Sequence, residues 1–260
     1  MEKLKSWLYS AIRWAAIVIV VVFGSVVCIG SVSAVEKSLS SEQQTEIQEL
    51  IRQYIIEHPA VIIDSLRKLE EQEERESAER ARKNLIGMRN QLVKDPSSPV
   101  GGNPNGDVTI VEFFDYRCGY CKRVGPIILK ILNKDPDVRY VFKELPILGP
   151  NSVTAARAAL AAWRIDPAKY QKFHFNLMGS RGQLTESKVM DVADKSGLDI
   201  RALKVAMQAP DIQKTMEKNR QLANELKING TPAFIVGDEL VPGAVDFTSL
   251  QRLIKKARKS

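Results

Sequence analysis

Two cysteines separated by two residues, Cys118 and Cys121, constrain the fold of this chain more than any other feature. An apolar, β-branched run from Val108 to Phe114 precedes them, and apolar residues at helical spacing follow as far as Leu132. A strand that leads directly into a helix delivers Cys118 to the first helical turn, where unpaired amide N–H groups and the helix dipole stabilise a thiolate over a thiol. We therefore expect Cys118 to be nucleophilic and Cys121 to be the more buried cysteine.

The third cysteine, Cys28, lies in a segment typical of a targeting sequence. Residues 1–34 start with positive charge, continue with an apolar stretch and end in small residues, which predicts a signal peptide cleaved after Ala34. The apolar stretch, at about 20 residues, is also long enough to span a bilayer as an uncleaved anchor. In both cases the rest of the chain is exported, and Cys118 and Cys121 can pair only with each other.

Three explanations compete for the cysteine pair. A zinc site needs two more ligands, and the two histidines, His58 and His174, lie far apart in unrelated helical patterns. A structural disulfide that closes so short a loop gives little chain-entropy stabilisation. A redox-active pair is therefore favoured, in which Cys118 attacks a disulfide and Cys121 resolves the mixed disulfide. We expect no metal and no cofactor.

Residues 35–94 predict a helical arm ahead of the main domain. They are rich in Glu, Gln, Lys and Arg, Ser41 and Gln44 resemble a capping box, and apolar residues recur at helical spacing as far as His58. A second helix begins near Pro59. The apolar stripe has no core of its own, so it must dock on the main domain or on a copy of itself, and we favour self-association through residues 41–94.

The main domain is predicted to cover residues 108–260, after a linker at residues 95–107 that holds three prolines and three glycines. Helical patterns between about 152 and 208 predict a helical insertion, and a closing helix runs from about 247 to 258. Three β-branched runs predict strands: 108–114, 138–145 and 232–236. This order predicts an α/β fold with helices on both faces of a small sheet.

Composition excludes little beyond this. The chain is 44% hydrophobic and 27% charged, which suits one sizeable domain with an accessory segment. The net charge of +7 includes +2 from the first 34 residues, and the +5 that remains is a mild excess. Part of it gathers in a predicted last helical turn, where it complements the helix dipole. We expect no nucleic-acid partner.

The strand before the cysteines, the motif Cys118-Gly119-Tyr120-Cys121, the later pair Thr231-Pro232 and the helical insertion together resemble the DsbA-like branch of the thioredoxin superfamily. The resemblance covers roughly residue 104 to the C-terminus and implies a thioredoxin-like fold. It also implies a cis peptide bond before Pro232, which lies against the cysteines, and a Thr231 backbone that binds a substrate strand. Gly119 and Tyr120 complete the implied substrate-binding residues.

The resemblance also assigns a role to Glu112. In the family, a buried acid at this position relays protons to the resolving cysteine. The resemblance therefore makes Glu112 a candidate catalytic residue beside Cys118 and Cys121. A glutamate in an otherwise apolar strand is costly unless it is used or paired. We expect Lys143, on the neighbouring strand, to be its partner.

Departures from the oxidising members of the family bear on the direction of the reaction. Those members have Pro-His between the cysteines and Val before the cis-proline, whereas Gly119, Tyr120 and Thr231 resemble DsbC-type isomerases, which are dimers held by an N-terminal module. Overall the chain is similar to suppressor-of-copper-sensitivity C proteins and to outer-membrane-associated DsbA-like antigens, which carry a helical oligomerisation arm and form dimers or trimers.

The resemblance thus implies a homodimeric or homotrimeric disulfide isomerase or reductase with some oxidase activity. Its expected location is the periplasm, with membrane anchoring or outer-membrane association as variants. Its expected partners are exported cysteine-containing proteins and a membrane thiol oxidant or reductant. Two alternatives stay open: a monomeric dithiol oxidase whose arm packs on its own domain, and a chaperone or surface-binding protein in which the cysteines are incidental.

Overall fold

The computed structural model describes residues 39–259. The chain divides into two compact units, Met1–Arg67 and Lys68–Ser260, which are treated separately below. The signal segment predicted at residues 1–34 lies outside the described residues. None of the helices that the structure describes is long and apolar enough to cross a membrane.

The first unit contains α2 (Ser41–Glu57) and the beginning of α3 (Ala60–Gly87). A capping box starts α2, but one residue earlier than predicted: the Ser40 hydroxyl accepts from the Gln43 amide at 3.2 Å, and the Gln43 side chain accepts from the Ser40 amide at 3.1 Å. Two serines are followed at the same spacing by two glutamines here, so the spacing alone does not distinguish the two boxes. No residue of α2 is buried.

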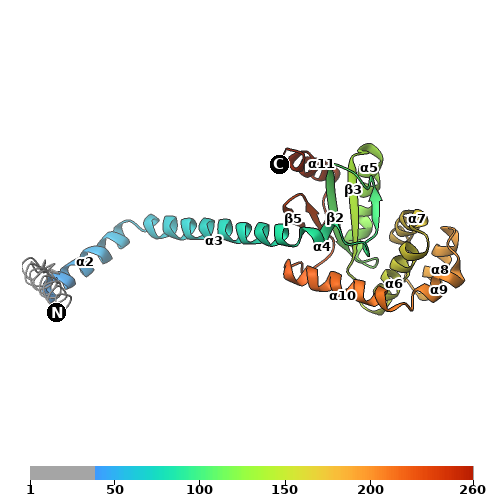
Figure 1. The fold of residues 1–260 in the computed structure, drawn as a ribbon. Helices are drawn as coiled ribbons and strands as arrows, with labels where there is room; N and C mark the ends of the chain where they lie inside the picture. The colour runs from blue at the N-terminus through green and yellow to red at the C-terminus, as the bar shows by residue number, and fades with distance from the viewer. Residues whose placement is uncertain (1–38, 260) are drawn as a thin grey trace, which may run out of the picture. The chain divides into compact units, whose positions relative to one another are not determined.

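The second unit is built on a five-stranded sheet with the order β1-β3-β2-β4-β5 (Figure 1). β2 and β3 are parallel, and the other neighbouring pairs are antiparallel. The strands are β1 (Val100–Gly102), β2 (Val108–Phe114), β3 (Val138–Glu144), β4 (Ala233–Val236) and β5 (Glu239–Pro242). β1 lies inside the stretch predicted as a linker. A three-residue strand with two glycines has no strand signature of its own, so the sequence does not predict this strand.

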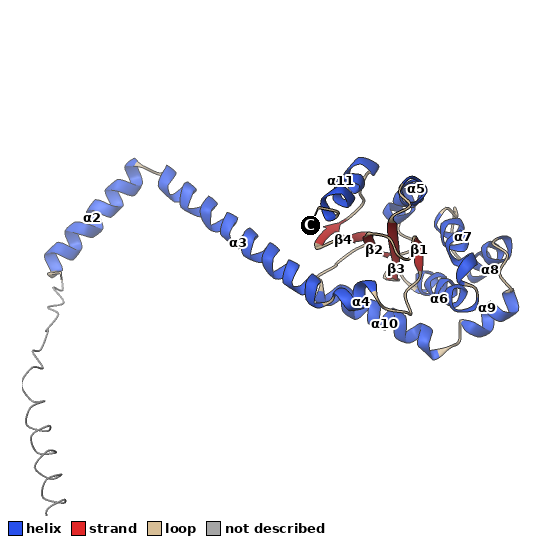
Figure 2. Cartoon of the chain, turned by 45° about the horizontal axis from the view of Figure 1, so that its top comes forward, coloured by secondary structure: helices blue, strands red, loops and turns tan. Residues whose placement is uncertain are grey.

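Helices cover both faces of this sheet, as predicted for a thioredoxin-like α/β fold. α5 and α11 lie on one face, and α4 and α10 lie on the other, while α6 to α9 form the helical insertion (Figure 2). The helices of this unit after α3 are α4 (Arg89–Val93), α5 (Gly119–Lys134), α6 (Pro150–Ile165), α7 (Pro167–Met178), α8 (Glu186–Lys195), α9 (Ile200–Ala206), α10 (Pro210–Glu225) and α11 (Phe247–Ala257).

Strand alternation divides the interior into two apolar cores. On β2, Ile110 and Phe114 face the core under α5 and the helical insertion, whereas Phe113 faces the opposite core. That second core also contains Leu85 from α3 and Leu92 from α4, which are 4% and 2% exposed. The end of the stretch predicted as an arm therefore packs into the catalytic unit, while α2 does not contribute to either core.

Lys143 does not pair with Glu112, contrary to the prediction. In the pairing of β2 with β3, Lys143 lies opposite Phe113 and Glu112 lies opposite Phe142, so the two side chains point to opposite faces of the sheet. The fully buried Lys143 ammonium donates instead to the Gln91 carbonyl at 2.8 Å and to the Ser98 hydroxyl at 2.8 Å, and Asp95 lies 3.4 Å away. Lys143 thus attaches α4 and the segment between α4 and β1 to the sheet.

This attachment predicts a loss of stability when the ammonium is removed. Lys143→Ala leaves a buried carbonyl and hydroxyl without their donor, and we expect it to lower the free energy of unfolding by about 2–4 kcal/mol in urea denaturation followed by circular dichroism. Lys172→Ala, at an exposed position of α7, is the matched control, with a change below about 0.5 kcal/mol. Equal effects of the two substitutions would contradict the assignment.

Candidate active site

The two cysteines lie where β2 ends and α5 begins, as the sequence predicts. Cys118 is the N-cap of α5, and its amide donates to the Asp115 carbonyl at 3.0 Å. Cys118 is 7% exposed and Cys121 is 1% exposed, and both are free thiols. Only Cys118 therefore presents surface to a partner, which confirms the expected difference in burial.

Thr231 and Pro232 lie against Cys118. The peptide bond between them is cis, as the resemblance implies, and the Cys118 thiol donates to the Thr231 carbonyl at 3.1 Å. These residues come just before β4, which pairs with β2. The antiparallel pairing of β2 with β4 therefore brings the proline loop to the start of α5.

The two residues between the cysteines are both exposed. Nothing lies within 4 Å of the position that a Cβ atom on Gly119 would occupy, so packing does not require glycine there. Tyr120 is 57% exposed, and the Arg123 guanidinium lies 5.0 Å from the centre of its ring. The dipeptide thus offers an open backbone and an aromatic face beside the nucleophile.

Glu112 lies behind Cys121, in a site that favours its neutral form. It is 3% exposed, and its one hydrogen bond in the described structure is from the Tyr140 hydroxyl at 2.6 Å. Burial raises the pKa of Glu112 to about 8, although the Tyr140 hydrogen bond opposes the shift. Burial, followed by the charge of Glu112, raises the pKa of Cys121 well above its usual value. Ionisation of Glu112 therefore disfavours ionisation of Cys121, and the reverse is also true.

The Asp115 carboxylate fixes the loop that presents Cys118. It accepts from the Arg117 amide at 2.7 Å and from the Ser152 hydroxyl at 2.8 Å through one oxygen. The other oxygen accepts from the amides of Ile147 and Leu148 at 2.9 and 3.0 Å. One buried side chain thereby joins the cysteine loop, the loop after β3 and the first turn of α6. This role of Asp115 was not predicted, although an acid directly after a buried strand is a usual signal of such a loop anchor.

A second buried network lies behind the same loop and was also not predicted. The Tyr116 hydroxyl lies 3.1 Å from Glu144 Oε1 and 2.9 Å from His174 Nδ1, and the Tyr170 hydroxyl lies 3.4 Å from the same oxygen. Burial raises the pKa of Glu144 and lowers that of His174 to about 3. Burial thus favours the neutral form of Glu144 and of His174, and the network supports Tyr116, two residues before Cys118.

The burial of Glu112 predicts a pH-dependent stability. The folded protein holds the Glu112 proton up to about pH 8, whereas the unfolded chain releases it near pH 4.5, so stability falls as pH rises between these values. Glu112→Gln removes this contribution, and we expect it to stabilise the protein by about 3–5 kcal/mol at pH 8.5 and hardly at all at pH 4. Urea denaturation of both proteins across this range measures the difference; a difference independent of pH contradicts the prediction.

Comparison with known proteins adds to this geometry. Residues 109–255 match the family model for the DSBA-like thioredoxin domain, and residues 43–76 match the model for the N-terminal domain of the copper resistance protein ScsC. The chain is similar to the crystal structure of a thioredoxin-like oxidoreductase from Silicibacter pomeroyi, with 46% identity and a TM-score of 0.64, covering 66% of this chain and 98% of that one.

The chain is also similar to three further proteins. A periplasmic thioredoxin-like protein from Salmonella enterica serovar Typhimurium is 37% identical, with a TM-score of 0.59, over 66% of this chain and 97% of that one. Disulfide bond formation protein D of Bacillus subtilis is 29% identical over 172 residues, which are 62% of this chain and 77% of that protein. The chain also matches a sodium/proton antiporter of Salinispora arenicola, of which it spans 24%.

Proposed function

This chain belongs to the DSBA-like thioredoxin domain family and is a thiol-disulfide oxidoreductase, and we propose that it works as a homo-oligomeric disulfide isomerase and reductase on exported, cysteine-containing proteins. The observation that carries the proposal is the Cys118 thiol at the start of α5, 3.1 Å from the carbonyl before cis-Pro232. A substrate strand that binds beside Thr231 therefore places its sulfur next to Cys118. Gly119 and Tyr120 border the same approach.

The proposed chemistry assigns different roles to the two cysteines. Cys118 thiolate attacks a substrate disulfide, its sulfur bonds to one substrate sulfur, and the other substrate sulfur leaves as a thiolate. Cys121 then either resolves the mixed disulfide, which reduces the substrate, or waits while the released thiolate attacks elsewhere, which rearranges it. Because Glu112 is neutral at pH 7, it is in the state that protonates Cys121 when the enzyme disulfide is opened, and its carboxylate takes the proton back when Cys121 attacks.

The helical arm supports oligomerisation. Ile47, Leu50, Ile51 and Tyr54 of α2, the arm stripe, lie on one side of the helix at helical spacing, and the last three are 61%, 54% and 53% exposed. Such a contiguous apolar surface is typical of an interface. We assign the arm role to α2 and the first turns of α3, because Leu85 and Leu92 belong to the core of the second unit. Subunits joined in this way would present their cysteines to one substrate, which suits isomerisation.

The proposed location is the periplasm, with a membrane thiol oxidant or reductant as the redox partner. The signal-like sequence of residues 1–34 and the similarity to a periplasmic thioredoxin-like protein of Salmonella enterica support this location. In the proposed organisation an arm precedes the catalytic domain, and the helices between β3 and α10 form its insertion.

Enzyme assays separate this proposal from the alternatives. We expect the protein to reduce insulin and to refold scrambled ribonuclease, and we expect Cys118→Ala to lose both activities, because it removes the attacking sulfur. Cys121→Ala should instead trap mixed disulfides. If Cys118→Ala kept its effect on ribonuclease refolding, a chaperone role would replace the enzymatic one.

Disruption of the arm stripe tests the oligomer. Ile51→Glu places a charge in an apolar interface, and we expect light scattering to show the monomer mass and ribonuclease isomerisation to fall at least about fivefold, with insulin reduction retained. Thr45→Glu adds the same charge to α2 outside the stripe and should change neither. A wild-type protein that is already monomeric favours the dithiol oxidase instead.

A further inference from the structure

A small cavity lies beside the active-site cysteines. It has a volume of about 300 Å³ and is lined by Arg117, Lys122, Gly182, Gln183 and Leu184. Arg117 is the residue before Cys118, and Lys122 is the residue after Cys121, so its two cations flank the redox motif. The Lys122 amide donates to the Cys118 carbonyl at 3.1 Å. Lys122 and Cys118 are thus one helical turn apart, and their Cβ atoms are about 5–6 Å from each other.

The lining of this cavity is cationic without a compensating acid. Within residues 39–259, neither Arg117 nor Lys122 has a carboxylate at ion-pair distance. The Arg117 guanidinium donates to the Leu148 carbonyl, and the Lys122 ammonium donates to the Ser180 carbonyl. A guanidinium has five N–H donors and an ammonium has three, so both groups keep donors for a ligand.

Nearby charge does not neutralise these cations. Asp115 is the acid closest along the chain, but it is 1% exposed and its oxygens accept four hydrogen bonds from the loops that it joins. Lys122 is half-buried, and burial lowers its pKa. A carboxylate bound in the cavity would offset this cost by favouring the ammonium form.

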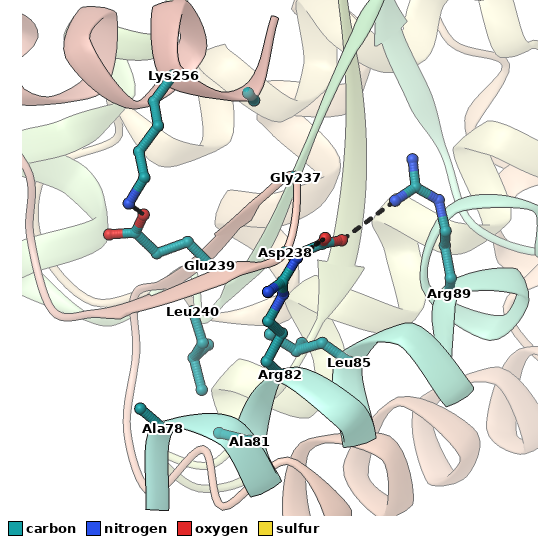
Figure 3. A pocket seen from close by; sticks show the side chains of 11 residues that line it. Ala78, Ala81, Arg82, Leu85, Arg89, Gly237, Asp238, Glu239, Leu240 and Lys256 are labelled. Carbon is teal, nitrogen blue, oxygen red and sulfur yellow. Dashed lines mark hydrogen bonds and ion pairs between the residues drawn. The ribbon is translucent and has the colours of Figure 1, made fainter. Parts of the chain in front are cut away.

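A larger cavity of the second unit differs in this respect. It has a volume of about 730 Å³ and lies between α3, the β4–β5 turn and α11 (Figure 3). Its arginines, Arg82 and Arg89, face Asp238 at 3.7 and 3.4 Å, and Lys256 faces Glu239 at 2.6 Å. The cations of the larger cavity are thus already paired, whereas those of the cavity beside the cysteines are not.

We propose that the cavity formed by Arg117 and Lys122 is a subsite for a carboxylate carried a few bonds from the reacting sulfur, so that the enzyme prefers anionic disulfides and thiols. Glutathione and cysteines flanked by an acidic residue share this chemistry. The proposal rests on the proposed function, because it requires Cys118 to be the attacking group. It adds a charge preference that the redox motif alone does not supply.

The proposed preference for anionic disulfides acts during the following thiol–disulfide exchange. The Cys118 thiolate attacks one sulfur of glutathione disulfide, a bond forms between the two sulfurs, and one glutathione leaves as a thiolate that takes up a proton. Cys121 then loses its proton, attacks the Cys118 sulfur and releases the second glutathione. The enzyme dithiol loses two electrons, the disulfide gains them, and the carboxylate of the bound half stays in the cavity during the first step.

A panel of small disulfides tests the subsite on the reduced, full-length protein. Glutathione disulfide is anionic, hydroxyethyl disulfide is neutral and cystamine is cationic at pH 7, and acid quench, alkylation and mass spectrometry give each rate. The double variant Arg117→Gln/Lys122→Gln should lower the ratio of the glutathione disulfide rate to the neutral rate by about fivefold, and added salt should lower the wild-type ratio in the same way. Dividing by the neutral rate removes any change in the reactivity of Cys118 itself.

Lys130→Gln/Lys134→Gln is the matched control, because it removes two charges from α5 outside the cavity, and its ratio should equal that of the wild type. Peptide disulfides with Asp or Asn beside the cysteine distinguish protein substrates from glutathione. An unchanged ratio in the double variant overturns the subsite while leaving the proposed function intact. A wild-type protein that reacts with none of the disulfides overturns the proposed function instead.

Discussion

The active site depends most on the hydrogen bonds that the buried Asp115 carboxylate accepts. Its four hydrogen bonds hold the end of β2, the loop after β3 and the start of α6 in one arrangement. Cys118 follows three residues later, so its position against Thr231 is fixed by a side chain that does not touch it. The buried network of Tyr116 and Glu144 supports the same loop from the interior. Catalytic geometry here is a property of the strand ends rather than of α5 alone.

Periodicity explains which parts of this fold could be predicted. The runs that became β2 and β3 and the helical patterns of the insertion are long enough for their apolar spacing to identify them, and the cysteine pair located the site between them. β1 has too few residues to carry a pattern. The capping box was misplaced by one residue because two serine and glutamine pairs share one spacing.

The error over Lys143 and Glu112 has a different cause. Residues on neighbouring strands share a face only when the pairing of the strands puts them in phase, and a shift of one residue moves a side chain to the opposite face. The sequence does not state how β2 aligns with β3. The Tyr116, Glu144 and His174 network escaped prediction for the same reason, because its members come from two strand ends and a helix that meet only in the folded protein. Local signals located the cysteines, but not the groups that surround them.

The contact between Cys118 and Thr231 joins positions 113 residues apart in the sequence. A chain still under synthesis contains the cysteine motif long before the proline loop has been made. Until β4 pairs with β2, the loop of Thr231 and Pro232 does not lie against Cys118, and no binding site for a substrate strand is formed. The site is thus complete only after the long-range pairing of β2 with β4 has formed, and the chain acquires its full reactivity only then.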